Sequence, residues 1–231
     1  MTDEESALLQ TASAAEKCGD HSAAINAWQQ LAFITNRPDY LCTFGLMAQK
    51  LGRWHDAENA FRDSLRADGE LWLAMASLGS LFLGRTDGDP STNAQTAKTW
   101  FEKAVAVTPS AISLSLLGAA HIRLGEKEDA KSVFRKAIEL DESYEEAYFN
   151  LGLLLADDGN SQEAETLLRK ATQLDPNYHQ AHGRLGILLQ QLGRYSEGDA
   201  ELRRAVEIDP TDTTAKHYLD NPAGRVGKSK I

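Results

Sequence analysis

Small and large apolar residues recur along the chain with a fixed period. A Leu-Gly pair recurs at Leu78-Gly79, Leu117-Gly118, Leu151-Gly152 and Leu185-Gly186. The last three copies are 34 residues apart, which is the length of one helix-turn-helix unit. Each such unit buries its apolar face only against its neighbours. The pattern therefore predicts a stack of helical hairpins, and no convincing strand-like alternation interrupts it.

Within each period, small and bulky residues occupy fixed positions. Position 8 is always glycine: Gly45, Gly79, Gly118, Gly152 and Gly186. Position 24, on the second helix, is always large: Phe61, Phe101, Phe134, Leu168 and Leu202. A small residue opposite a large one lets two helices approach closely. Glycines mark the turn between the two helices, and Pro109, Pro176 and Pro210 mark the end of the second helix.

These positions together resemble the tetratricopeptide repeat family. The resemblance implies an all-α, right-handed superhelical solenoid of tandem helix-turn-helix units. We expect six units over residues 5–212, with boundaries at 5–37, 38–71, 72–110, 111–144, 145–178 and 179–212. The first unit is degenerate, and the third needs a loop insertion at 84–96. A short helix over 213–220 is expected to cap the last unit, before a basic tail at 221–231.

Charge and composition exclude several classes of partner. The chain has 231 residues, 34 acidic and 24 basic side chains and a net charge of −10, so its field repels nucleic acid and anionic lipid. The acidic start, MTDEESALLQ, does not match a secretory signal, and no apolar run approaches the ~18 residues that span a bilayer. We therefore predict a cytoplasmic protein without a nucleic-acid or membrane partner.

Two apparent ligand motifs are incomplete. The tail residues Gly227, Lys228 and Ser229 resemble a phosphate-binding loop, but Pro222 stands where the first glycine is required and no strand precedes it. The segment Asp87–Asn93 resembles the start of a calcium loop, but the twelfth position is Lys98 rather than an acid. A turn followed by an Asp or Ser helix cap explains the second segment better.

The histidines and cysteines suggest no chemistry. His121 and His182 occupy core-facing positions, so we expect them to be packing residues. No Ser, Cys or carboxylate recurs beside a histidine at a spacing that would build a nucleophile and base. Cys18 and Cys42 lack a zinc-binding spacing and are interpreted as small packing residues. The sequence thus predicts a non-enzyme with no catalytic residue, metal or cofactor.

The side of the first helices opposite the packed stripe carries the candidate site. Positions 2, 6, 9 and 13 lie on this side, which by the family resemblance lines a concave groove. A helix packed on one side should be polar there. Instead it carries apolar residues beside two polar ones; the candidate residues are Leu46, Leu73, Ile112, Leu116, Phe149, Asn150, Leu153, Arg184 and Ile187. We predict that the groove binds an apolar or amphipathic segment of a partner protein. The alternative is that neighbouring helices or the chain's own tail cover these residues.

A carboxylate-binding mode that is known from some members of this family fits the sequence poorly. Some tetratricopeptide domains hold the C-terminal carboxylate of heat-shock chaperones with a clamp of Lys, Asn and Arg. Asn150 and Arg184 match two of its five positions, while Ser115, Ala119 and Gln180 fill the others. Without a lysine the charge is too small for a doubly anionic tail. The sequence therefore favours an interaction scaffold. The alternatives are a chaperone-like protein that shields an exported or assembling client, and a homo-oligomeric assembly factor with weak self-association through a bare terminal repeat.

Overall fold

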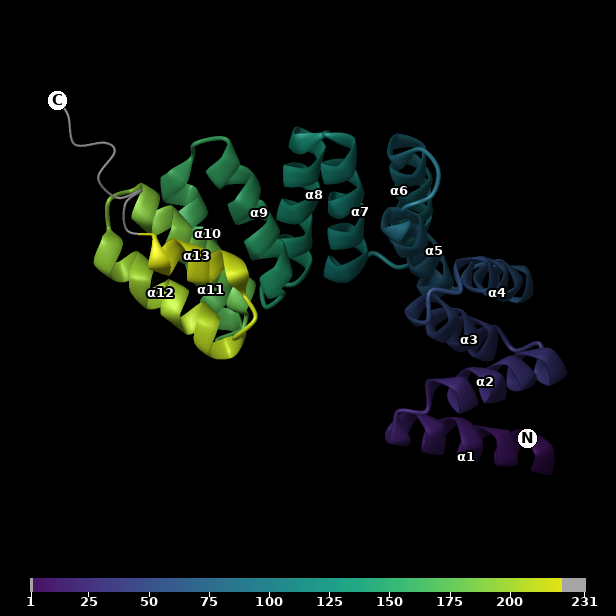
Figure 1. The fold of residues 1–231 in the computed structure, drawn as a ribbon. Helices are drawn as coiled ribbons and strands as arrows, with labels where there is room; N and C mark the ends of the chain where they lie inside the picture. Colours follow the sequence, from purple (N-terminus) through teal and green to yellow (C-terminus); the bar gives the residue numbers. More distant parts are fainter. Residues whose placement is uncertain (1, 222–231) are drawn as a thin grey trace. The chain divides into compact units, whose positions relative to one another are not determined.

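The computed structural model describes residues 2–221, and this part of the chain consists of helices without strands (Figure 1). It divides into two compact units, one ending at Glu126 and the other beginning at Lys127. The all-α class predicted from the sequence period is confirmed. None of the described helices is long and apolar enough to cross a membrane. Apart from Asn221, the basic tail and its phosphate-loop-like residues lie outside the described range.

The N-terminal unit contains three hairpins and the first helix of a fourth. Its helices are α1 (Asp3–Cys18), α2 (His21–Thr35), α3 (Pro38–Lys50), α4 (Trp54–Ala67), α5 (Trp72–Gly84), α6 (Pro90–Val107) and α7 (Ala111–Leu124). Each helix packs on the next one in the chain, and α5 also packs on both α3 and α7. Helices α3, α5 and α7 therefore form one layer, which we call the first-helix layer.

The C-terminal unit repeats this arrangement. Its helices are α8 (Lys127–Leu140), α9 (Glu145–Asp157), α10 (Ser161–Leu174), α11 (His179–Gln191), α12 (Tyr195–Ile208) and α13 (Thr213–Asp220). Helices α9 and α11 pack against each other as neighbouring first helices. The short α13 packs on both α12 and α11, so a helix covers the end of the unit where the sequence predicts a cap.

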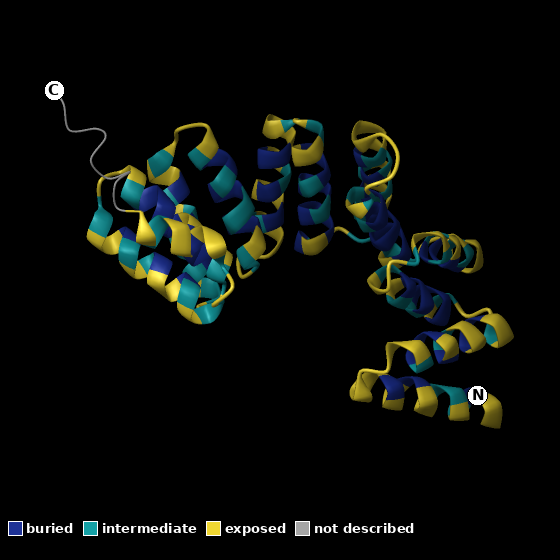
Figure 2. Ribbon diagram, in the orientation of Figure 1, coloured by how far each residue is buried: buried dark blue, intermediate teal, exposed yellow. Residues whose placement is uncertain are grey.

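The small-against-large pairing predicted from the period holds together the hairpins α3–α4, α5–α6, α9–α10 and α11–α12. A Cβ added to Gly45 would lie 2.5 Å from the Phe61 ring, and one added to Gly186 would lie 2.7 Å from Leu202 Cγ. Phe61 and Leu202 are fully buried. Buried residues consequently follow the line where the two helices of a hairpin meet, and exposed residues follow the outer edges (Figure 2). Close helix contact thus depends on the absence of a side chain at position 8.

The turn glycines adopt the left-handed conformation expected from the sequence. Gly125 ends α7 with a φ of 76°, and its N–H donates to the carbonyl of Ile122 at 3.0 Å. The next N–H, from Glu126, donates to the carbonyl of His121 at 2.9 Å. These two bonds satisfy carbonyl groups that the end of a helix otherwise leaves open.

The expected insertion at 84–96 is mostly helical rather than a loop. Only residues 85–89 lack helical structure, and the added residues lengthen α6 to 18 residues. Asp89 caps this helix, because its carboxylate accepts a hydrogen bond from the Thr92 N–H at 2.7 Å, and Pro90 occupies the first helical position. The prediction of a loop over 84–96 is therefore wrong. The interpretation of an Asp residue in this segment as the cap of the next helix is correct.

Three of the four predicted packing residues are buried. His121, His182 and Cys42 lie in the interior, and each histidine Nδ1 lies 2.6 Å from a carboxylate oxygen, of Glu126 and Glu201 respectively. Cys18 is exposed at the last residue of α1. Its interpretation as a packing residue is wrong, because its side chain is exposed to solvent rather than buried in the core.

Candidate binding surfaces of the first helices

The N-terminal unit exposes large aliphatic side chains on three successive first helices. Leu46 on α3 is 41% exposed, Leu73 on α5 is 39% exposed and Ile112 on α7 is 49% exposed. All three belong to the predicted site. With Leu116 we call them the apolar stripe. The structure therefore leaves the predicted apolar face of this unit open to solvent rather than covered by the described part of the chain.

Leu116 differs from the other three residues of the stripe. It is half-buried and packs against a cluster formed by Met75, Ala76 and Ala104. Its side chain thus contributes to the contact between α5 and α7 as well as to the surface. A charged substitution at Leu116 would destabilise the fold, so Leu73 and Ile112 are the better positions for testing binding.

The first-helix surface of the C-terminal unit is more polar and more covered. Phe149 is half-buried, and its ring centroid lies 4.9 Å from that of Tyr178 in a tilted arrangement. Leu153 and Asn150 are also half-buried, while Arg184 is exposed. Phe149 packs against the core cluster of this unit and is therefore partly structural.

Ile187 does not line an open surface. It is only 8% exposed and packs in a cluster with Leu202, Ala205 and Ala215, the last of which belongs to α13. The sequence-based assignment of Ile187 to the binding face is wrong. The chain itself covers this residue, because α13 folds back onto α11 and α12.

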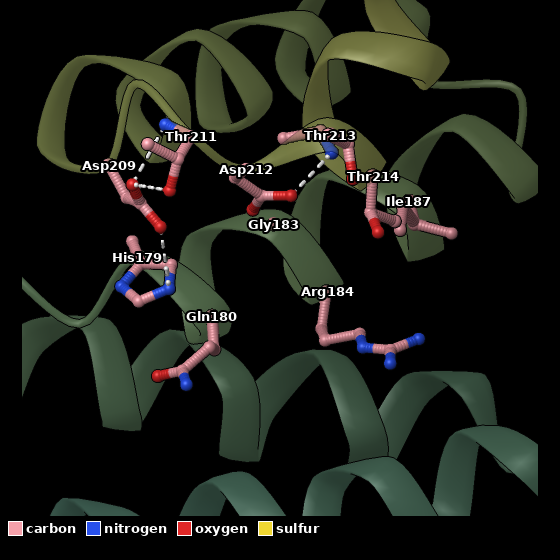
Figure 3. Close-up of a pocket in the computed structure, with 11 residues that line it drawn as sticks. His179, Gln180, Gly183, Arg184, Ile187, Asp209, Thr211, Asp212, Thr213 and Thr214 are labelled. Carbon is pink, nitrogen blue, oxygen red and sulfur yellow. Dashed lines mark hydrogen bonds and ion pairs between the residues drawn. The ribbon is translucent and has the colours of Figure 1, made fainter.

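A polar pocket of about 260 Å³ lies beside Ile187, between α11 and the turn that leads into α13 (Figure 3). His179, Gln180 and Arg184 line it from α11, and Asp209 and Asp212 line it from the turn. The repeat period gives no indication of this pocket. The Asp-x-Thr-Asp-Thr-Thr stretch after the last repeat is its only sequence signal.

The carboxylates of this pocket already have partners. Asp209 accepts hydrogen bonds from the hydroxyl and the N–H of Thr211 at 2.7 and 2.8 Å, and these bonds lower the pKa of Asp209. The Asp212 carboxylate accepts the Ala215 N–H at 2.9 Å and caps α13. Within residues 2–221, by contrast, no side chain pairs with the guanidinium of Arg184. Arg184 and Gln180 are thus lining residues whose side chains have no hydrogen-bond or ion-pair partner within residues 2–221.

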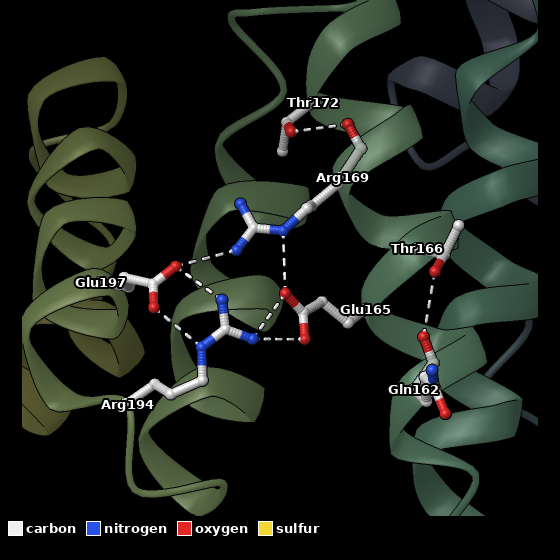
Figure 4. A network of polar contacts seen from close by, with 7 residues as sticks. All are labelled: Gln162, Glu165, Thr166, Arg169, Thr172, Arg194 and Glu197. Atoms are coloured by element: carbon white, nitrogen blue, oxygen red, sulfur yellow. Dashed lines mark hydrogen bonds and ion pairs between the residues drawn. The ribbon is translucent and has the colours of Figure 1, made fainter.

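A network of ion pairs joins the second helices of the C-terminal unit (Figure 4). Arg194 Nη1 lies 2.6 Å from Glu165 Oε2, and Arg194 Nη2 lies 2.6 Å from Glu197 Oε2. Arg169 contacts the same two carboxylates at 2.9 and 3.2 Å. Partial burial acts to raise the pKa of Glu165, but hydrogen bonds from both arginines outweigh it and lower that pKa. These four side chains engage one another, so we assign them to the packing of α10 beside α12.

The buried His121 lies beside Glu126, and Glu126 also contacts Lys98. The Glu126 oxygen 2.6 Å from its Nδ1 also accepts a hydrogen bond from the Lys98 ammonium at 2.8 Å. The hydrogen bond with Lys98, and second the one with His121, lower the pKa of Glu126. The Glu126 carboxylate already pairs with the Lys98 ammonium. A catalytic base lies instead beside a nucleophile, so His121, Glu126 and Lys98 do not form a site of that kind.

Stacked helical hairpins with a small-against-large core define a repeat protein of the solenoid class. Two models of the tetratricopeptide repeat family match the sequence, one over residues 115–179 and the other over residues 155–219. Residues 115–219 of the chain are therefore tetratricopeptide repeats. This fold serves protein–protein interaction and is generally non-catalytic. The division of the preceding residues into repeats stays a prediction.

Solved structures share the fold at low sequence identity. A tetratricopeptide repeat protein called YrrB, described as having an unusual peptide-binding site, has a TM-score of 0.58 and 21% identity, over 85% of this chain and all of that one. A thermophilic tetratricopeptide repeat protein of Thermus thermophilus gives 0.65 and 22%, over 80% and 98%. A chain of the APC/C hetero-tetramer Cut9-Hcn1 gives 0.74 and 16%, over 90% and 40%. No curated protein matches the sequence significantly.

Proposed function

We propose that the chain is a non-enzymatic scaffold whose apolar stripe captures an apolar or amphipathic segment of a partner protein. The observation that supports this most strongly is the exposure of Leu46, Leu73 and Ile112, each on a different first helix. A helix that packs on one side should carry polar residues on the other. Large aliphatic side chains exposed on successive first helices are therefore candidates for an interaction site.

The free energy gained by burying these side chains limits the kind of partner that can bind. Covering the exposed parts of three aliphatic side chains contributes on the order of 2–4 kcal/mol. Association costs at least about 4 kcal/mol in lost translational and rotational freedom. The stripe alone cannot hold a partner, so the bound segment must also make polar contacts. An amphipathic segment that lays its apolar side on the stripe meets this requirement.

The polar candidate residues belong to the C-terminal unit. Asn150 is half-buried and Arg184 is exposed, and both carry groups that bind a peptide backbone or a carboxylate. We propose that they contact a peptide backbone or a carboxylate at the C-terminal unit itself, with Phe149 and Leu153 contributing their exposed edges. The family likeness to YrrB, a protein described as binding peptide, is compatible with this role.

The proposal is tested by cross-linking from Ser80, which lies seven residues, or about two helical turns, after Leu73 on α5. A photoreactive amino acid replaces Ser80, a half-exposed residue of α5, and the matched control places it at Leu140, which is 56% exposed on α8. After irradiation in native lysate, the peptide joined to position 80 is identified by mass spectrometry. We expect one segment with apolar residues on one side that does not join to position 140. Equal labelling from both positions would contradict the proposal.

The same experiment separates a scaffold from a chaperone-like protein. A scaffold joins to one partner, and the binding saturates at a fixed stoichiometry. Shielding of exported or assembling clients would instead join several unrelated apolar segments, and the purified protein would then suppress the aggregation of unrelated unfolded proteins. We favour the scaffold, because the stripe is small and needs added polar contacts that few segments provide.

A further inference from the structure

Helix α2 has an unusual outward surface. Phe33 is 88% exposed, and the neighbouring Ile34 is 44% exposed. The 15 residues of α2, HSAAINAWQQLAFIT, include no Asp, Glu, Lys or Arg. The corresponding second helices α4, α8, α10 and α12 each carry several charged residues. A quarter of the whole chain is charged, so this charge-free helix with an exposed aromatic side chain stands apart from the rest of the surface.

Phe33 stands between two open pockets. One pocket, of about 480 Å³, is floored by Ala32, Leu41, Phe44 and Ala60. The other, of about 460 Å³, is lined by Glu4, Leu8, Asn26, Gln30 and Ile34. Phe33 and Gln29 belong to both linings. The surface therefore presents a protruding ring with an apolar hollow on either side.

Charges at the rim of the first pocket are compensated locally. Asp56 lies 2.6 Å from Arg53, and Asp63 pairs with Arg66. Both arginines belong to the same hairpin as the acids they pair with. Glu4, which lines the second pocket, is thus the one acid of the two linings without an ion pair within residues 2–221, although the chain as a whole carries −10.

We propose that this face binds a second copy of the chain about a two-fold axis, with Phe33 of each copy inserted into a pocket of the other. A two-fold interface uses the same patch on both molecules, so the patch must be complementary to itself. A protruding ring beside a hollow on one face satisfies that condition. A cavity of about 150 Å³ holds a benzene ring, so either pocket has room for the phenyl group.

Electrostatics favours a second copy over a different protein. Two molecules of charge −10 repel each other over most orientations, but α2 itself adds no charged side chain to this repulsion, and among the acids that line the two pockets only Glu4 has no ion pair within residues 2–221. A basic partner would gain from contact with the acidic remainder of the surface and would find no acid on α2 itself. The core of a protein interface is depleted in charged residues and enriched in aromatic ones, as this face is. Because α2 and its surroundings form a small patch, the dimer is weak and concentration-dependent.

The first test is the mass of the protein in solution. Sedimentation equilibrium at increasing concentration should show the mass rising from 25.3 kDa towards twice that value. Phe33→Ser should move the midpoint to at least tenfold higher concentration, whereas Leu140→Ser, at another exposed apolar residue on α8, should leave it unchanged. Circular dichroism verifies that both variants are folded. A wild-type chain that stays monomeric throughout, or a Phe33→Ser variant that dimerises like the wild type, would overturn the proposal.

A second test locates the axis. In a Cys18→Ser background, Gln29→Cys should form an intermolecular disulfide under mild oxidation, because residues near a two-fold axis meet their own copies. Gln162→Cys, on the exposed side of α10, is the control and should remain reduced. Equal cross-linking at both positions would indicate collisional contact and overturn the assignment. So would loss of a different protein partner in Phe33→Ser without any change in self-association.

Discussion

The ring of Phe61 lies so close to Gly45 that a Cβ on that glycine would stand 2.5 Å from the ring carbon Cε1. Gly45 is at position 8 of its repeat and Phe61 is at position 24, on the second helix of the same hairpin. The same contact recurs between Gly79 and Phe101 and, with leucine in place of the ring, between Gly152 and Leu168. In each of these hairpins, the contact between a glycine and a large side chain thus sets the spacing of the two helices.

Gly45→Ala should destabilise the N-terminal unit by about 1–3 kcal/mol, because the added methyl group overlaps a fully buried ring that has no room to move. Urea unfolding followed by circular dichroism measures the change. Gly183→Ala is the matched control, since its Cβ would meet the nearest atom at an ordinary 3.6 Å. That variant should be neutral or more stable by up to about 1 kcal/mol. A Gly45→Ala protein as stable as Gly183→Ala would show that the close pair does not set the helix spacing.

The network around Glu165 should make stability depend on pH. Hydrogen bonds from Arg194 and Arg169 hold the pKa of Glu165 below its ordinary 4.5 in the folded protein, against the opposing effect of burial. The charged carboxylate therefore stabilises the fold fully above pH 4.5, and this contribution is lost as the pH falls through the lower folded pKa. Glu165→Gln should lower stability by about 1 kcal/mol at pH 7, and the difference from wild type should disappear in acid.

The control for this prediction is Glu139→Gln. Glu139 is exposed on α8, and no ion pair involves it within residues 2–221. Thermal unfolding of both variants and wild type from about pH 7 to about pH 2.5 supplies the comparison. A constant gap between Glu165→Gln and wild type over this range would mean that the network does not depend on the charge of Glu165.

The two cysteines should differ in reactivity. Burial raises the pKa of the Cys42 thiol to about 11, and the residue is 1% exposed, whereas Cys18 is exposed at the end of α1. Because the thiolate is the nucleophile, one thiol per molecule should react rapidly with Ellman's reagent at about pH 8, and the second only after unfolding in urea. Cys18→Ser should remove the rapid reaction. Two rapid thiols in the wild-type chain would contradict the burial of Cys42.

The cap formed by α13 should stabilise the C-terminal unit. Ala215 is 1% exposed against Ile187, Leu202 and Ala205, so Ala215→Glu should cost about 1–3 kcal/mol and increase the binding of a hydrophobic dye. Thr214→Glu, at the exposed neighbouring position, should have little effect on either measurement. Equal behaviour of the two variants would show that α13 does not cover Ile187 in solution.

Much of the fold could be predicted because each unit repeats the same packing problem. The starts of five first helices coincide with the positions from which the period was counted, at Pro38, Trp72, Ala111, Glu145 and His179. The sequence around Asp89 and Pro90 was ambiguous, since the same residues suit a turn and a helix start. The structure shows that they begin α6. Periodicity alone could not decide this, because the added residues have no counterpart in the other units.

The candidate site was predictable only where local pattern determines exposure. Leu46, Leu73 and Ile112 are exposed because nothing in the described chain covers their face of the first helices. Ile187 has the same pattern and is buried, because α13 comes from outside the repeat and packs over it. Phe33 lies in a degenerate repeat, where the period gave no expectation for an exposed aromatic residue. The exposure of Ile187 and of Phe33 therefore depends on whether another part of the folded chain covers the side chain, and the repeat pattern alone does not show this.

The proposed role of the apolar stripe is tested most directly by the affinity of the segment identified by cross-linking. A synthetic fluorescent peptide of that segment is titrated with wild type, with the Leu73→Glu, Ile112→Glu double variant and with Leu140→Glu as control. We expect the double variant to bind at least tenfold more weakly, a loss of about 1.4 kcal/mol or more, with the control equal to wild type and all three folded. Equal affinities for the double variant and wild type would contradict the assignment of the stripe as the binding site.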